Sequence, residues 1–269
     1  MSEEQLFLIE HHEHVATVWL NRPNKRNAMT DTVFRRLTTL FRGLDQDRNV
    51  RAIVLAAKGK SFCAGLDLTS LSQMPHMDMM EQTARNRMDL LGVVRDWQEG
   101  ISAVETCRKP VIAAIHGACV GAGLDLAAAC DIRLASQDAF FSLREAAMAI
   151  TADLGSLQRL PRIIGEGFTR EMAYTAGDYT AEQAFSMRLL NRVVDSQEAL
   201  LKAAQELAAQ IAAQSPLAVQ SSKETLNFSR DNTIEEGLQF AAMRNAMILP
   251  SEELMEAFMA FMEKRKPSF

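Results

Sequence analysis

The sequence predicts an α/β fold over residues 1–195, followed by a helical region over residues 196–269. Between residues 10 and 195, short apolar runs of strand length alternate with longer segments of helical periodicity. The runs at 51–57 and 110–115 have no polar alternation, which is typical of parallel strands covered on both faces. The pattern indicates a parallel sheet built from strand–helix–strand crossovers.

The first elements are predicted to be a hairpin and a capped helix. Residues 5–11 and 14–21 predict two strands joined by a polar turn. Thr30 is expected to be the N-cap of the next helix, because a threonine oxygen can accept a first-turn N–H. The apolar residues behind it recur at helical spacing, at Val33, Leu37, Leu40, Phe41 and Leu44.

The middle of the chain continues the alternation of strands and helices. The expected elements are a strand at 51–57, a loop at 58–68, a helix at about 74–106, a strand at 110–115, a Gly-rich turn at 117–123, a helix that ends near Cys130 and a strand at 132–136.

Only helices are predicted after residue 195. They cover 196–213, 216–229, 232–248 and 251–264, with N-cap candidates at Asp195 or Ser196, Ser215, Asp231 and Ser251. A helical region of this length can fold back on its own core or contact a second copy of the chain.

Composition indicates an ordinary globular protein. Of the 269 residues, 48% are hydrophobic and 23% are charged, which is enough apolar material for a large core. A net charge of −5 argues against nucleic acid as a partner. No apolar run approaches membrane-spanning length and the N-terminus lacks a signal core, so we expect a cytoplasmic protein without a membrane partner.

The four cysteines lack a C-x-x-C pair and are expected to be free thiols. The N-terminal histidines have no carboxylate or cysteine to complete a metal site, so no metal is expected.

Two Gly-containing turns follow apolar strands and carry the first chemical signal. They are Ser61-Phe62-Cys63-Ala64-Gly65-Leu66-Asp67-Leu68 and His116-Gly117-Ala118-Cys119-Val120-Gly121-Ala122-Gly123-Leu124-Asp125. A strand that ends in such a turn before a helix leaves N–H groups pointing outward, where the helix dipole favours negative charge. Either turn alone is explained by a tight strand-to-helix connection. Two in one chain favour donors for an oxygen that becomes negative, as in an enolate.

Three carboxylates follow the second turn, at Asp125, Glu145 and Asp153. Each has a structural alternative: Asp125 can complement a helix dipole, Glu145 can pair with Arg144, and Asp153 can be a helix N-cap. Asp153 has apolar neighbours, however, and such surroundings raise the pKa of a carboxyl group. A carboxyl group of this kind can carry a proton at neutral pH.

The two turns and the strand between them resemble the enoyl-CoA hydratase/isomerase (crotonase) superfamily. The matching motifs are 62–67, 109–117 and 121–126, and the resemblance extends from Val15 to Lys264. It implies a crotonase-like spiral of ββα units with a C-terminal helical trimerisation region. It also implies that the backbone N–H groups of Leu66 and Ala122 form an oxyanion hole, although many relatives have glycine at position 122.

Within this superfamily, residues 123–161 are similar to Δ3,5-Δ2,4-dienoyl-CoA isomerases. The similarity implies a β-oxidation enzyme in which Glu145 takes a proton from carbon 2, Asp153 delivers one to carbon 6, and Asp125 orients the pair. Two alternatives remain. In an enoyl-CoA hydratase, Asp125 and Glu145 would hold a water molecule for addition to trans-2-enoyl-CoA. A non-catalytic CoA-binding or scaffold protein would turn over neither substrate.

The coenzyme A portion of the substrate is expected to contact two parts of the chain. A basic loop contains Arg22, Lys25 and Arg26, and such a loop is often simply solvated. The family places coenzyme A at this loop and beside Ala64, which implies a site made of Arg22, Lys25, Arg26, Ala28 and Ala64. Phe261 and Lys264 resemble a C-terminal pair that reaches the nucleotide from a neighbouring subunit, which implies a homotrimer or homohexamer. No separate cofactor is expected, because coenzyme A is part of the substrate.

Overall fold

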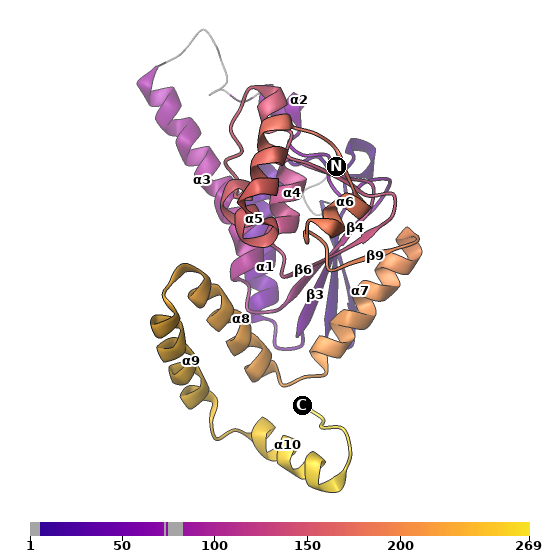
Figure 1. The fold of residues 1–269 in the computed structure, drawn as a ribbon, viewed down its shortest axis with the longest axis vertical. Coiled ribbons are helices and arrows are strands. Elements are labelled where there is room, and N and C mark those ends of the chain that lie inside the picture. Colours follow the sequence, from indigo (N-terminus) through magenta and orange to yellow (C-terminus); the bar gives the residue numbers. More distant parts are fainter. Residues whose placement is uncertain (1–5, 73, 75–82) are drawn as a thin grey trace.

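The computed structural model describes residues 6–72, 74 and 83–269, and helices pack around two sheets (Figure 1). The larger sheet has the strand order β1–β2–β3–β4–β6–β9. Its strands are β1 (Phe7–His12), β2 (Val15–Leu20), β3 (Ala52–Ala57), β4 (Val111–Ile115), β6 (Ile132–Ser136) and β9 (Arg192–Val194). Strands β1 and β2 form an antiparallel hairpin, whereas every later pair is parallel. The predicted parallel sheet is therefore confirmed.

Helices cover both faces of this sheet. Strands β2, β3 and β4 are buried along their whole length. Alternate side chains such as Val18 and Leu55 face α1 (Asp31–Gln46) and α3 (Ala84–Thr106), whereas Trp19 and Val54 belong to the cluster formed with α7 (Gln197–Ala212). Figure 1 shows α7 on the opposite side of the sheet from α1 and α3. Burial on both faces explains why the sequence of these strands lacks a polar alternation.

A second, smaller sheet has the strand order β5–β7–β8. It consists of β5 (Ala118–Val120), β7 (Phe140–Ser142) and β8 (Tyr179–Thr180). Strand β5 lies inside the segment 117–123, which the sequence predicted as a turn throughout. Strands of two or three residues are too short to display a periodicity of two, so this sheet could not be predicted from the sequence.

The other elements of the α/β part are short helices and one long helix. They are η2 (Pro23–Lys25, a 3₁₀-helix), α2 (Leu68–Ser72), α4 (Ala122–Ala129), η4 (Glu145–Met148, a 3₁₀-helix), α5 (Ser156–Thr175) and α6 (Ala181–Ser186). Thr30 is the N-cap of α1, as predicted, and its side chain accepts from Val33 N–H. The helix expected over 74–106 is confirmed from Ala84 onward, and part of its expected start, at 75–82, lies outside the described residues.

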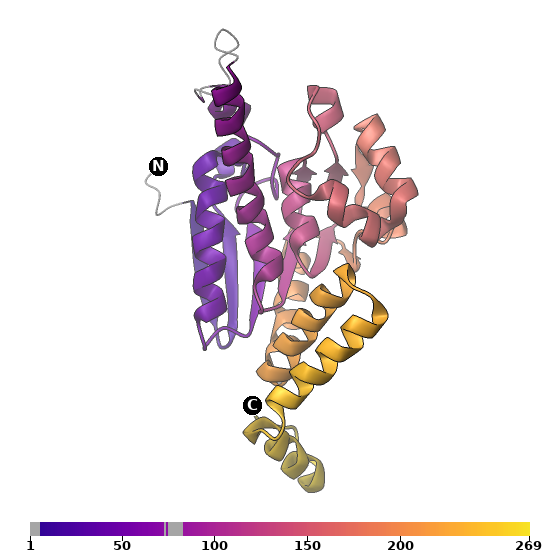
Figure 2. The same cartoon turned by 90° about the vertical axis from the view of Figure 1, so that its left-hand side faces the viewer.

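Three further helices extend away from the sheets, α8 (Pro216–Asp231), α9 (Ile234–Ile248) and α10 (Glu252–Glu263) (Figure 2). A partly buried ion pair ties α8 to the rest of the chain, because the buried Lys223 Nζ lies 2.6 Å from Asp131 Oδ2. Helices α8 and α9 pack through stacked rings of Phe228 and Phe240, whose centroids are 4.3 Å apart. The domain boundary at residue 195 stays a prediction. Helix α7 packs against the sheet rather than with the arm formed by α8–α10.

The predicted N-caps of the C-terminal helices are confirmed in three of four cases. The side chains of Ser196, Ser215 and Ser251 each accept a first-turn N–H. Asp231 was wrong, because it is the last residue of α8, and Thr233 caps α9 in a capping box. Of the helices described, none has the length and apolar character required to cross a membrane.

Candidate active site

The two predicted turns lie side by side. Cys63 and Cys119 form an isolated parallel bridge, in which Cys63 N donates to Ala118 O at 2.9 Å and Val120 N donates to Cys63 O at 3.0 Å. A Cβ added to Gly65 would lie 3.0 Å from Val120 O. Glycine is required here for this close approach, and also because its φ is +97°. The main chain alone therefore brings the two turns together.

The N–H groups of Leu66 and Ala122 are left free by this arrangement. The bridge between Met29 and Leu66 uses Gly65 O and Asp67 N, so the N–H of Leu66 stays outside it. Ala122 is the first residue of α4, and a first-turn N–H has no acceptor within its own helix. Within residues 6–72, 74 and 83–269, neither group donates a hydrogen bond to the protein. Both can therefore donate to an added oxygen.

Asp125 is fully enclosed in the first turn of α4, with 1% of its surface exposed. Its Oδ1 accepts hydrogen bonds from Ser156 N at 2.5 Å and from Ser156 Oγ at 2.6 Å. Its Oδ2 is buried without a hydrogen-bond partner in the described part of the chain. Burial raises the pKa of Asp125 to about 6, although the bonds from Ser156 and the charge of Arg159 oppose that rise.

Glu145, at the start of η4, lies against the second turn. Its Oε1 is 3.1 Å from the position that a Cβ on Gly121 would occupy. Its Oε2 is buried, and no described group bonds to it. Burial raises the pKa of Glu145 to about 7, and the charges of Asp125 and Asp153 add to the rise. Arg144 pairs with Asp178, so Arg144 does not neutralise Glu145 as the alternative explanation supposed.

Asp153 lies in the loop before α5 and is the most exposed of the three carboxylate residues. It does not cap that helix, because Gly155 is at the N-cap position and Asp125 accepts the N–H of Ser156 instead. Its carboxyl group is partly desolvated, and this raises the pKa of Asp153 as well. The charge of Asp153 contributes to the raised pKa values of both Asp125 and Glu145. The structure thus brings the three predicted carboxylates close enough to act on one another.

The predicted coenzyme A residues near the first turn are also adjacent, but they differ in availability. Ala64 N donates to Arg26 O at 3.0 Å, so the basic loop runs beside the turn. The Arg22 side chain is engaged inside the protein, with Asp67 at 3.0 Å and the carbonyl of Ala28. The side chains of Lys25 and Arg26 are exposed, as a site for phosphate groups requires.

Phe261 and Lys264 lie elsewhere. Phe261 is on α10 and is 79% exposed, and Lys264 is the C-cap of that helix. Figures 1 and 2 both show α10 at the end of the molecule opposite α2 and well away from α4. The structure of a single chain therefore does not bring this pair to the other candidate residues.

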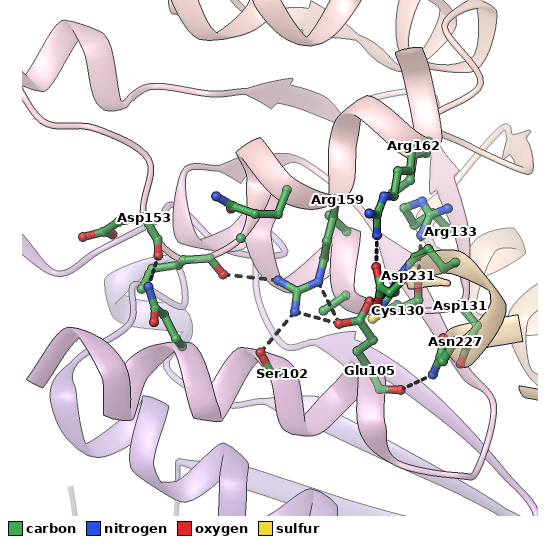
Figure 3. A pocket seen from close by; sticks show the side chains of 18 residues that line it. Ser102, Glu105, Cys130, Asp131, Arg133, Asp153, Arg159, Arg162, Asn227 and Asp231 are labelled. Atoms are coloured by element: carbon green, nitrogen blue, oxygen red, sulfur yellow. Dashed lines mark hydrogen bonds and ion pairs between the residues drawn. The ribbon is translucent and has the colours of Figure 1, made fainter. Parts of the chain in front are cut away.

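A cavity of about 780 Å³ lies beside Asp153, between α3, α5 and α8 (Figure 3). Its wall is charged and includes Glu105, Arg159, Arg162 and Asp231. Figure 3 shows the Asp153 carboxylate directed away from the arginines of this wall. Sequence reasoning assigned no role to Ser156, Arg159 or Gln98, although the first two lie in the motif at 123–161. Their contacts cross between elements, which no local pattern reveals.

Comparisons with known proteins all match proteins of one family. A family model described as "Enoyl-CoA hydratase/isomerase" matches residues 10–269. The chain is 42% identical over 255 residues to the mitochondrial Delta(3,5)-Delta(2,4)-dienoyl-CoA isomerase of Dictyostelium discoideum, covering 95% of this chain and 87% of that protein. It is 43% identical over 251 residues to the peroxisomal enzyme of the same name from Arabidopsis thaliana, covering 93% and 90%. The crystal structure of an enoyl-CoA hydratase from Bacillus anthracis matches with a TM-score of 0.90 and 30% identity, covering 98% of this chain and 99% of that one. The predicted fold class is confirmed.

Proposed function

Because the chain belongs to the enoyl-CoA hydratase/isomerase family, we propose that it converts 3,5-dienoyl-CoA into 2,4-dienoyl-CoA in fatty acid β-oxidation. One observation carries the proposal: three carboxyl groups whose pKa values are all raised lie beside two turns whose N–H groups, at Leu66 and Ala122, have no acceptor among the described residues. Relatives that bear the dienoyl-CoA isomerase name match more than nine-tenths of the chain.

The proposed reaction moves one proton out and one proton in. The thioester oxygen accepts hydrogen bonds from the N–H groups of Leu66 and Ala122, and a donor of this kind typically contributes about 3 kcal/mol. Glu145 removes the proton from carbon 2, and the C–H electron pair moves into the thioester to give an enolate, whose negative oxygen is held by the two N–H groups. When Asp153 delivers its proton to carbon 6, the enolate pair returns to form the 2,3 double bond. The 3,4 pair moves to 4,5, and the 5,6 pair forms the new C–H bond at carbon 6.

The unusual pKa values suit these roles. Glu145 with a pKa of about 7 is a stronger base than an ordinary glutamate, yet it is still ionised in part at neutral pH. The raised pKa of Asp153 increases the fraction that holds a proton to deliver. Asp125 is fixed by its two bonds to Ser156, and its charge keeps the neighbouring Glu145 basic.

Replacing Asp153 tests the proposal directly. We expect Asp153→Asn to lower the turnover of 3,5-dienoyl-CoA by about 10²–10⁴-fold, the usual contribution of a general acid or base. Binding of coenzyme A, measured by calorimetry, should stay within about twofold, since the mutated carboxyl acts on the acyl chain rather than on the nucleotide. Asp195→Asn, at an exposed aspartate, is the control. Near-full activity of Asp153→Asn would refute the isomerase assignment.

A hydratase is the second candidate, because Asp125 Oδ2 and Glu145 Oε2 are buried oxygens that have no hydrogen-bond partner among the described residues and could hold a water molecule. That reaction does not need an acid at position 153. Hydration of trans-2-enoyl-CoA that survives Asp153→Asn would favour this candidate. Binding of coenzyme A without turnover of either substrate would favour a non-catalytic protein.

We propose further that the working unit is a homotrimer or homohexamer in the cytoplasm. Support for an oligomer comes from the distance of Phe261 and Lys264 from the other coenzyme A residues and from the large apolar side chains exposed on α8–α10. The relatives named above are labelled mitochondrial and peroxisomal, so location is a separate question. A fluorescent fusion imaged in the source cells tests it, and an organellar signal would refute the cytoplasmic proposal.

A further inference from the structure

We propose that Arg159 is a positioning residue that holds the turn at 153–155, and with it the Asp153 carboxyl, in the orientation needed for proton delivery. The role in proton delivery rests on the function proposed above. The position of the turn can be judged independently of it.

Arg159 belongs to the first turns of α5, and its guanidinium folds back over the turn that precedes the helix. Its Nη1 donates to Leu154 O at 3.3 Å, next to Asp153 in the chain. The same Nη1 is 1.8 Å from the position that a Cβ on Gly155 would take, so it occupies the space above this glycine. Only a residue without a side chain leaves room for the guanidinium there.

The other nitrogens of Arg159 are fixed by α3. Nε and Nη2 donate to Glu105 Oε2 at 3.2 and 2.8 Å, and Nη2 also donates to Ser102 Oγ at 3.1 Å (Figure 3). Only 12% of the Arg159 side chain is exposed, and Glu105 is comparably enclosed. A planar guanidinium with several bonds at fixed angles is therefore braced between α3 and the turn, which a flexible lysine could not reproduce.

Two more contacts complete the support of the turn. Gln98 Nε2, from α3, donates to Asp153 O at 2.6 Å. On the far side, Asp125 accepts from Ser156 N and Oγ. The segment from Asp153 to Ser156 is thus held by α3, α4 and α5, and Arg159 is the cationic member of this set. The charges of Arg159 and Asp153 act on Asp125, and the charges of Asp125 and Asp153 act on Glu145.

Arg162 provides a matched control one turn further along α5. It lines the same cavity and pairs with Asp231 at 2.5 Å, but it is half exposed and has no hydrogen bond to the turn. A general effect of removing one arginine from this cavity should therefore appear equally in Arg159→Gln and Arg162→Gln. A positioning effect should appear in Arg159→Gln alone.

The experiment compares wild type, Arg159→Gln, Arg159→Lys and Arg162→Gln with 3,5-dienoyl-CoA. We expect Arg159→Gln to lower kcat by about 10–100-fold, as a small misplacement of a catalytic group does, with KM changed less than twofold. Arg159→Lys keeps the charge but not the bond geometry, and should recover only part of kcat. Arg162→Gln should match wild type. An unchanged kcat in Arg159→Gln, or an equal loss in Arg162→Gln, would overturn the proposal.

A second readout does not depend on turnover. Carbon-13 NMR of aspartate carboxyl groups, with Asp153 assigned through Asp153→Asn, follows the environment of this side chain. We expect its resonance and its titration to change in Arg159→Gln and not in Arg162→Gln. If wild type fails to isomerise dienoyl-CoA, the proposed function fails, and this measurement still decides the position of the turn. An unchanged Asp153 resonance in folded Arg159→Gln would overturn it.

Discussion

At the scale of single residues, Glu145 is the group whose ionisation should control the rate. A general base must be deprotonated to act, and the pKa of Glu145 is raised to about 7. We therefore expect kcat/KM to fall as the pH drops through about 7, rather than through the range of an ordinary glutamate. A pH profile of kcat/KM with 3,5-dienoyl-CoA measures this midpoint. An acid limb centred near pH 4.5 would contradict the assignment of Glu145 as the base.

Asp125→Asn tests the electrostatic part of the same explanation. The asparagine oxygen can still accept the two hydrogen bonds from Ser156, but the negative charge beside Glu145 is gone. Removing a like charge lowers the pKa of a carboxyl group, so the acid limb should move to lower pH. Asp178→Asn, which breaks the surface pair with Arg144, is the control and should leave the limb in place.

The candidate site was predictable from the sequence only in part. Asp125, Glu145 and Asp153 were singled out by type, spacing and family resemblance, and the structure places them together. The partners that hold them, Ser156 and Arg159, were not recognised. A serine after a glycine and an arginine on a helix are common, and only the packing of α3, α4 and α5 gives them their contacts.

At the scale of elements, the close contact between α4 and the first turn depends on Gly123. A Cβ at this position would lie 2.6 Å from Cys63 O and 2.8 Å from Cys63 Cβ. Gly123→Ala should therefore push the helix away, separate the N–H groups of Leu66 and Ala122, and lower kcat by about 10–100-fold. Overpacking of this kind also costs about 1–3 kcal/mol of stability, measurable by denaturant unfolding.

Gly43 is the matched control for that substitution, because it is exposed on α1 and a Cβ there would meet no atom of the described residues within 4 Å. Gly43→Ala should keep full activity and raise the free energy of unfolding by about 0.5–1 kcal/mol. If Gly123→Ala behaved like Gly43→Ala, the spacing of the two turns would not matter for catalysis.

Long elements were predicted well because their patterns are long. The apolar runs of β3 and β4 and the helical spacing of α1 extend over enough residues to indicate one structure each. The serines before the C-terminal helices mark where those helices begin. The small sheet of β5, β7 and β8 was missed, although it sets the position of the second turn. Its strands are defined by pairing with distant segments, and such pairing is not written in local periodicity.

At the scale of the whole molecule, the arm formed by α8–α10 exposes much apolar surface. Ile234 is 84% exposed, Leu238 66% and Met247 70%, which is unusual for a chain that works alone. We expect Leu238→Glu to shift a trimer or hexamer toward monomer in analytical ultracentrifugation. Gln239→Glu, the same charge change at an adjacent exposed position of α9, should leave the assembly intact. A wild-type monomer would contradict this prediction.

The parallel bridge between Cys63 and Cys119 has one more consequence, for how such a protein can change over evolutionary time. The two N–H groups belong to the main chain, so the side chains at 66 and 122 can be exchanged without removing either donor. In a saturation library, positions 65, 121 and 123 should tolerate few replacements, whereas 66 and 122 should accept many that reshape the space around the acyl group. A protein built in this way can change its substrate preference by mutation and still keep both hydrogen-bond donors.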